Sequence, residues 1–194
     1  MVSTGTMTFI SGGVRSGKSA YAESLLTTAA GQSGRLVYIA SGQATDQEMQ
    51  ARIRQHQVDR AHENWQTIEQ PTQLENVLHY IERGDFVLWD CMTTWLANEL
   101  YEGWESGTPC ITQDGCMEQK AREVLRTIEA IANRAAHFVI VSNEVLNDSP
   151  SRYKETRIYQ QWLGTLHQQV VALSTKAIEM ESGIPIYWKG EERT

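Results

Sequence analysis

Cysteine is scarce in this chain, with three among 194 residues, and no two of them form a Cys-x-x-Cys pair. The scarcity argues against a disulfide framework and against a zinc site, because each of these needs paired or clustered cysteines. We therefore expect reduced thiols and a cytoplasmic protein. Residues 1–8 also lack the basic start and the long apolar core of a secretory signal peptide.

Positive charge is in short supply as well, with 17 lysines and arginines against 24 aspartates and glutamates. The net charge of −7 argues against nucleic acid as a partner, because contacts to a phosphate backbone need positive side chains. The apolar runs are short, and Phe138–Val141 is far from long enough to cross a bilayer, so no membrane insertion is expected. What remains is a globular composition, and the length suits one domain over residues 1–194.

Short apolar runs alternate with longer helical segments along this chain, which predicts an α/β fold with a mainly parallel sheet. Runs that are apolar on both faces are typical of parallel strands covered by helices. Ser182-Gly183 is a turn signal and predicts an antiparallel hairpin at the C-terminal end. The expected strands are Met7–Ser11, Leu36–Ala40, Trp65–Glu69, Phe86–Trp89, Phe138–Val141, Ala177–Met180 and Ile184–Trp188.

Helices are expected between these strands. Two capping boxes, each a threonine followed three residues later by a glutamate, predict helix starts at Thr45 and Thr72. An apolar stripe at helical spacing runs from Ile158 to Leu173 and is most simply core packing. The predicted helices cover residues 19–30, 45–60, 117–136 and the segment around 158–173, and residues 102–116 are expected to be a loop or insertion.

Residues Gly12-Gly13-Val14-Arg15-Ser16-Gly17-Lys18-Ser19 match the phosphate-binding loop (P-loop) pattern G-x-x-x-x-G-K-[ST]. In this pattern the glycines let backbone N–H groups face the phosphates, the lysine reaches the β- and γ-phosphates, and the final hydroxyl ligates Mg²⁺. An ordinary glycine-rich turn is the alternative. The apolar strand before the loop and the helix after it favour nucleotide binding.

Asp90 ends the apolar run Phe86–Trp89. A carboxylate at this place emerges at the carboxyl edge of a parallel sheet, where a P-loop protein needs a second Mg²⁺ ligand. We predict that Ser19 and Asp90 hold the metal, and the alternative is an ordinary loop aspartate.

These motifs together resemble the bifunctional adenosylcobinamide kinase / adenosylcobinamide-phosphate guanylyltransferase family. The loop is similar to its G-G-x-R-S-G-K-S signature, and the other similar segments follow in the family's order. The resemblance implies a P-loop NTPase (RecA-like) three-layer fold, homotrimers and a role in cobalamin (vitamin B12) biosynthesis. The matching segments are residues 38–41, 46–56, 65–69, 90–98 and 142–145.

The resemblance implies two successive reactions. The first phosphorylates adenosylcobinamide with ATP or GTP. The second transfers GMP from GTP onto adenosylcobinamide phosphate, which gives adenosylcobinamide-GDP and releases pyrophosphate.

By the same resemblance, His56 is the residue that becomes guanylylated. A neutral imidazole can attack the α-phosphorus of GTP, and a histidine pKa of about 6.5 keeps enough of the neutral form in the cytosol. Arg60 suits a phosphate, and Glu69 suits the N–H groups of guanine, although either can be an ordinary surface residue. The segments expected to contact the guanine nucleotide are Ala40, Ser41, Gly42, Gln57, Val58, Asp59, Arg60 and Glu69.

The chain departs from the family pattern after Val145. Leu146-Asn147-Asp148-Ser149-Pro150 replaces the family's G-x-G-I-V-P loop, so we expect different contacts to the corrinoid acceptor. Two other functions stay open at this stage: a small-molecule P-loop kinase without guanylyl transfer, and a nucleotide-binding protein that has lost one or both activities.

Overall fold

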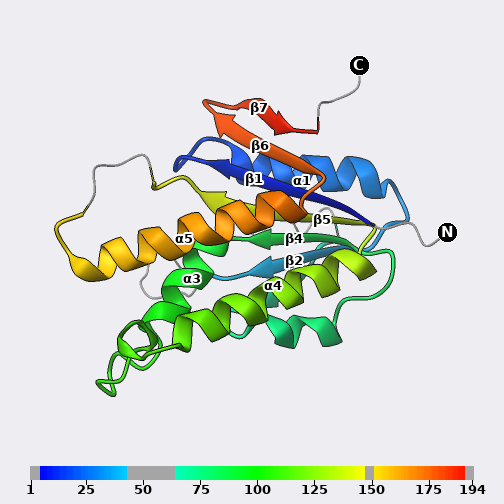
Figure 1. Ribbon diagram of the computed structural model, residues 1–194. Coiled ribbons are helices and arrows are strands. Elements are labelled where there is room, and N and C mark those ends of the chain that lie inside the picture. The colour runs from blue at the N-terminus through cyan, green and yellow to red at the C-terminus, as the bar shows by residue number, and fades with distance from the viewer. Residues whose placement is uncertain (1–4, 43–63, 147–150, 191–194) are drawn as a thin grey trace.

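The computed structural model describes residues 5–42, 64–146 and 151–190. Its strands form one sheet in the order β3-β2-β4-β5-β1-β6-β7 (Figure 1). The β6–β7 pair is antiparallel and the other neighbouring pairs are parallel, which confirms the expected sheet. The strands are β1 (Thr6–Gly12), β2 (Leu36–Ala40), β3 (Gln66–Glu69), β4 (Phe86–Asp90), β5 (His137–Asn143), β6 (Lys176–Glu181) and β7 (Ile184–Lys189).

Helices cover both faces of this sheet. One face packs against α1, and the other packs against α3, α4 and α5 (Figure 1). Within the described ranges, no helix is both long enough and apolar enough to cross a bilayer. The helices are α1 (Lys18–Ala30), α3 (Met92–Tyr101), α4 (Cys116–Arg134) and α5 (Lys154–Leu173), with short 3-10 helices at η1 (Leu74–His79) and η2 (Cys110–Thr112).

Strand β4 shows why the middle of a central strand is apolar on both faces. Val87 and Trp89 pack into the core on the α3–α5 side, whereas Leu88 packs into the core on the α1 side. Successive side chains of a strand point to opposite faces, so a strand covered on both faces buries its middle residues on both sides, and only the two end residues of β4 are partly exposed. The α5 stripe packs as expected at Leu166 and Val170, but Leu173 at its end is exposed.

The helix predicted from the Thr72 capping box was wrong in its start and its type. The structure has the 3-10 helix η1, which begins at Leu74, and its N-cap is Gln73 with φ 51°. The buried carboxylate of Glu99, on α3, accepts a hydrogen bond from the Gln73 N–H at 2.7 Å. A tertiary contact therefore satisfies the N–H of the residue that caps η1, which is the role that a capping box gives to the glutamate at its fourth position. The helix expected over residues 45–60 lies outside the described residues.

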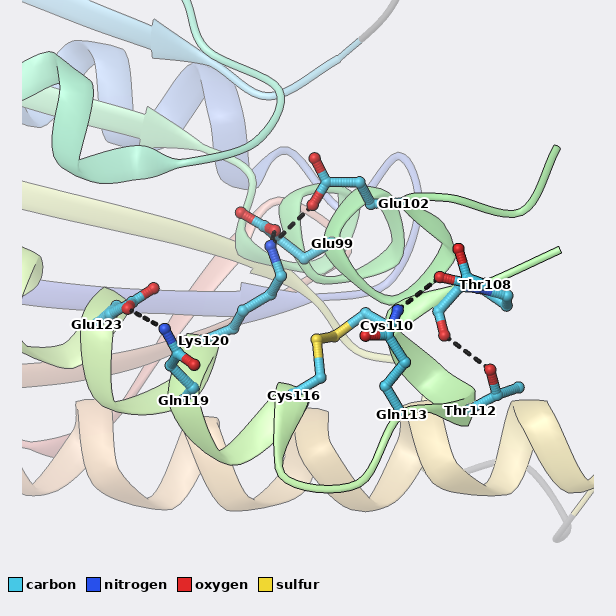
Figure 2. Close-up of a disulfide and its surroundings, with 11 residues drawn as sticks. Glu99, Glu102, Thr108, Cys110, Thr112, Gln113, Cys116, Gln119, Lys120 and Glu123 are labelled. Carbon is cyan, nitrogen blue, oxygen red and sulfur yellow. Dashed lines mark hydrogen bonds and ion pairs between the residues drawn. A yellow bond between two sulfur atoms is a disulfide. The ribbon is translucent and has the colours of Figure 1, made fainter. Parts of the chain in front are cut away.

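The expectation of unpaired cysteines was also wrong, because Cys110 and Cys116 form a disulfide (Figure 2). Their Cα atoms lie 5.6 Å apart, since the turn at η2 and Gly115, with φ 75°, reverse the chain before α4 begins. Cys91 is free and buried. A disulfide needs only two cysteines that lie close together in the folded chain, so the absence of a Cys-x-x-Cys pair did not exclude one.

Candidate nucleotide-binding site

The P-loop leads from the end of β1 into α1. Its helix begins at Lys18, and the N-cap Gly17 has φ 89°, in the left-handed region that glycine adopts most readily. Arg15 is also left-handed, with φ 61°. The structure thus confirms the strand–loop–helix context, and the positive end of α1 lies at the loop.

Four carbonyl oxygens of the loop before α1 have backbone partners, and one of them is the Gly17 oxygen, which accepts from the Tyr21 N–H at 2.9 Å. The N–H of Ser16 donates to the Gly13 oxygen at 3.2 Å, the N–H of Glu144 donates to the Gly12 oxygen at 2.8 Å, and the N–H of Gly183 donates to the Ser16 oxygen at 3.0 Å. A loop that turns its N–H groups toward an anion needs donors for its carbonyl groups elsewhere. Here the end of β5 and the turn between β6 and β7 supply two of them.

Lys18 is held inside this loop. Its Nζ donates to the carbonyl oxygen of Gly13 at 3.0 Å, and the residue is only 7% exposed. Burial lowers the pKa of Lys18, while the negative charge of Asp90 acts against that shift. The structure therefore brings the P-loop lysine and Asp90 to the same edge of the sheet, where β1 and β4 end.

Asp90 is the last residue of β4, and one of its carboxylate oxygens accepts a hydrogen bond from the Tyr38 hydroxyl at 2.9 Å. Ser19 lies in the first turn of α1. Hydroxyl and carboxylate oxygens are ligands that Mg²⁺ prefers, and Mg²⁺ sites in nucleotide enzymes are completed by phosphates and water. Among the residues that the structure describes, no group of three or more His, Cys, Asp and Glu side chains could hold a metal ion.

The other predicted nucleotide contacts lie farther along the same edge. Ala40 at the end of β2 is in register with Glu69 on β3 and with Asp90 on β4. Two strands separate β2 from β1, which places Ala40 roughly 14 Å from the end of β1. The hydroxyl of Ser41 is buried and accepts a hydrogen bond from the Trp89 indole at 2.8 Å, so this side chain holds the strand end together.

Some predicted residues lie outside the part of the chain that the structure describes. They are His56, Gln57, Val58, Asp59 and Arg60, together with positions 147–150 of the divergent loop. Gly42, the last described residue before the first internal gap, is half-buried.

Asn143 also lies at this edge of the sheet, although the sequence analysis named it only within the matching segment 142–145 and not as a site residue. It ends β5, in register with Gly12, and β5 lies between β1 and β4. Its amide nitrogen donates to the Thr93 hydroxyl at 3.0 Å and contacts the Cys91 sulfur at 3.7 Å. The position of Asn143 directly after an apolar run was the available signal, because the same argument had selected Asp90.

Comparisons with known proteins cover nearly the whole chain. The family described as cobinamide kinase / cobinamide phosphate guanyltransferase matches residues 8–187. The chain is 32% identical over 182 residues to the bifunctional adenosylcobalamin biosynthesis protein CobU of Escherichia coli (strain K12), covering 93% of this chain and 98% of the relative. It is 35% identical over 185 residues to the bifunctional adenosylcobalamin biosynthesis protein CobP of Pseudomonas aeruginosa, covering 94% and 96%.

A solved structure supports the fold. The flagellar accessory protein FlaH from Methanocaldococcus jannaschii matches with a TM-score of 0.52 and 12% identity, over 97% of this chain and 80% of that chain. At this identity the likeness concerns the fold alone, a P-loop NTPase (RecA-like) three-layer fold. The family match and the two relatives, each covering nearly the whole chain, show that the chain belongs to the cobinamide kinase / cobinamide phosphate guanyltransferase family.

Proposed function

We propose that Lys18, Ser19 and Asp90 serve the nucleotide triphosphate in both reactions of this cobinamide kinase and cobinamide phosphate guanyltransferase of cobalamin biosynthesis. The observation that carries the proposal is the placement of Lys18, which is hydrogen-bonded within the loop and lies in the field of Asp90. A single lysine at this place can contact the same phosphate tail whether ATP or GTP is bound. The whole P-loop, from Gly12 to Ser19, then lines one phosphate site in one domain over residues 1–194.

In the kinase reaction the protein contributes position and charge. The hydroxyl oxygen of adenosylcobinamide attacks the γ-phosphorus and gives up its proton to solvent, the bond from that phosphorus to the β-phosphate oxygen breaks, and ADP or GDP leaves with the bonding electron pair. Negative charge spreads over the transferring oxygens, and a positioned ammonium such as Lys18 stabilises it. Mg²⁺, held by Ser19 and Asp90, would neutralise charge on the phosphates when bound.

In the second reaction we propose His56 as the nucleophile, with Ala40–Gly42, Gln57–Arg60 and Glu69 around the guanine nucleotide. An imidazole nitrogen attacks the α-phosphorus of GTP, and pyrophosphate leaves with the bonding electron pair. A phosphate oxygen of adenosylcobinamide phosphate then attacks the same phosphorus, and the P–N bond breaks to restore the histidine. The covalent intermediate divides one difficult transfer into two easier ones.

We also propose a homotrimer and a cytoplasmic location. Both follow from membership of the family, and the location suits an enzyme that consumes ATP and GTP. The reduced-thiol argument for the cytoplasm no longer applies, because two of the three cysteines are paired. Sedimentation equilibrium would test the trimer by a mass three times that of the 21.9 kDa chain.

Labelling with GTP carrying ³²P at the α-phosphate tests the proposed nucleophile. The wild-type protein should acquire acid-labile, base-stable label and release pyrophosphate in a single turnover, because a phosphoramidate is cleaved by acid. His56→Ala should acquire no label. His79→Ala is the matched control, since His79 is exposed on η1, and it should label normally. Label that persists in His56→Ala would remove His56 from this role.

A further inference from the structure

The C-terminal hairpin of β6 and β7 lies directly beside the P-loop. Strand β6 pairs with β1, with Met180 in register with Gly12 where the loop begins. The hairpin turn has two residues, Ser182 with φ 52° and Gly183 with φ 84°, the left-handed pair of a tight type I′ turn. Figure 1 shows the hairpin at the end of the sheet, next to β1.

The turn makes the first of two contacts with the loop region. The N–H of Gly183 donates to the carbonyl oxygen of Ser16 at 3.0 Å. Gly17 and Gly183 are neighbours, because a Cβ added at Gly17 would lie 3.6 Å from the Gly183 Cα, at ordinary van der Waals distance. The hairpin turn therefore supports the loop immediately before Lys18.

Strand β7 makes the second contact, on the helix side of the loop. The hydroxyl groups of Tyr187 on β7 and Tyr21 on α1 are hydrogen-bonded at 2.7 Å. Tyr21 belongs to the first turn of α1, and its N–H donates to the Gly17 carbonyl oxygen at 2.9 Å. This contact therefore fixes the start of the helix just after Ser19.

The two contacts enclose Lys18 and Ser19, one on each side along the chain. We infer that the β6–β7 hairpin positions the P-loop, with Gly183 and Tyr187 as positioning residues that set the affinity for the nucleotide triphosphate. The inference rests on the proposed phosphate site. It assigns a role to a hairpin that would otherwise only extend the sheet, and neither residue needs to touch the nucleotide.

Replacing Tyr187 with phenylalanine removes one hydroxyl and keeps the ring, which also lies 6.0 Å from the Lys176 ammonium. Trp188→Phe is the matched control on the same strand, because it removes the indole N–H that donates to Glu179 at 2.9 Å within the hairpin. Each change deletes a side-chain hydrogen bond of β7, which is part-buried at Tyr187 and exposed at Trp188. Only the Tyr187 bond reaches α1.

The binding probe is the non-hydrolysable GTP analogue guanosine 5′-(β,γ-imido)triphosphate with Mg²⁺, titrated calorimetrically. Tyr187→Phe and Tyr21→Phe should each weaken binding by about fivefold, the size expected for one hydrogen bond. The double variant should be no weaker than either single variant, because both remove the same bond. In turnover, the KM for GTP should rise and the KM for adenosylcobinamide should stay unchanged. Gly183→Ala, strained at φ 84°, should act in the same direction.

A purely structural hairpin gives a different result. Tyr187→Phe would then lower the unfolding temperature while binding the analogue as tightly as the wild type, and the inference would be wrong. Support requires weaker binding in Tyr187→Phe together with an unfolding temperature no lower than that of Trp188→Phe. A wild-type protein that does not bind the analogue would instead overturn the proposed nucleotide site, and the inference with it.

Discussion

The P-loop corner, where Gly12–Ser19 meets the β6–β7 hairpin, and the α3–α4 corner, residues 99–120, are held together by different chemistry. At the P-loop corner, backbone N–H groups and a buried lysine satisfy the loop's carbonyl groups. At the α3–α4 corner, the disulfide between Cys110 and Cys116 joins the insertion to the start of α4 (Figure 2). Lys120 also bridges the carboxylates of Glu99 and Glu102 there.

This difference in chemistry suggests that the P-loop corner serves nucleotide binding and that the α3–α4 corner serves folding stability. Backbone hydrogen bonds fix the direction of neighbouring N–H groups, which is what a phosphate site needs. A covalent link and a bridging ion pair restrict how far helices can separate, but they orient no group toward the sheet edge. We therefore expect changes at the P-loop corner to act mainly on nucleotide chemistry and changes at the α3–α4 corner to act mainly on unfolding.

Acid should have the largest effect, a loss of folding stability that arises at two buried histidines bonded to β1 and β5. His137 bonds Thr8 of β1, and His167 bonds Ser142 of β5, next to β1 in the sheet. Burial lowers the pKa of each histidine to about 4, and the Lys176 charge adds to the effect at His137. The unfolded chain binds a proton at each histidine below about pH 6.5, whereas the folded chain does not until about pH 4.

Stability should therefore fall as the pH drops from 6.5 to 4, by about 3 kcal/mol for each histidine. Urea denaturation across that range measures the slope. The double variant His137→Gln/His167→Gln should lose most of this slope, whatever its stability at pH 7. A wild-type stability that stays flat between pH 6.5 and 4 would contradict buried, neutral histidines.

Lys18→Ala should reduce both reactions by about 10²- to 10³-fold, because it removes the positive charge beside the transferring phosphate. The free energy of unfolding should change little, since removing a desolvated charge offsets the lost hydrogen bond to Gly13. Phosphorylation and self-guanylylation assays, with urea denaturation alongside, measure the two effects. Lys154→Ala, at an exposed lysine that begins α5, is the control. Normal guanylylation with lost phosphorylation would require two separate nucleotide sites.

Opening the disulfide should have the smallest effect, and only on unfolding. The link closes a loop with a sequence separation of 6, for which chain entropy predicts a loss of about 2 kcal/mol. The unfolding temperature in dithiothreitol, or in Cys110→Ser/Cys116→Ser, should therefore fall by roughly 4–8 °C with unchanged activities. Dithiothreitol should not affect the double variant further. A large loss of nucleotide binding in the protein without this disulfide would contradict the assignment of the α3–α4 corner to stability alone.

The strands and the P-loop could be predicted from the sequence because each leaves a local pattern. The expected strands agree with the observed ones to within one or two residues at each end. Helix α3 was not predicted, since it begins after Cys91 without a side-chain cap and its first turn carries Thr93 and Thr94. Its stability comes from burial, with Met92, Trp95, Leu96 and Leu100 all in the core.

The candidate site divides in the same way. Lys18 and Asp90 could be found because a motif and a strand end mark them. The Gly183–Ser16 bond could not, because it joins residues far apart in sequence and depends on the register between β1 and β6. The partner of a loop carbonyl is thus a property of sheet topology, which local patterns do not encode.

Gly12 illustrates a genetic consequence of the hairpin. A Cβ at this position would lie 2.6 Å from the backbone oxygen of Met180 and 2.6 Å from the Ser16 hydroxyl oxygen. One neighbour is main chain and cannot be trimmed by mutation, whereas the other is a side chain that can. Suppressors of a Gly12→Ala allele should therefore need two kinds of change, a smaller residue at Ser16 and a shift of β6 through the hairpin. The residue that position 12 can tolerate therefore depends on the position of β6.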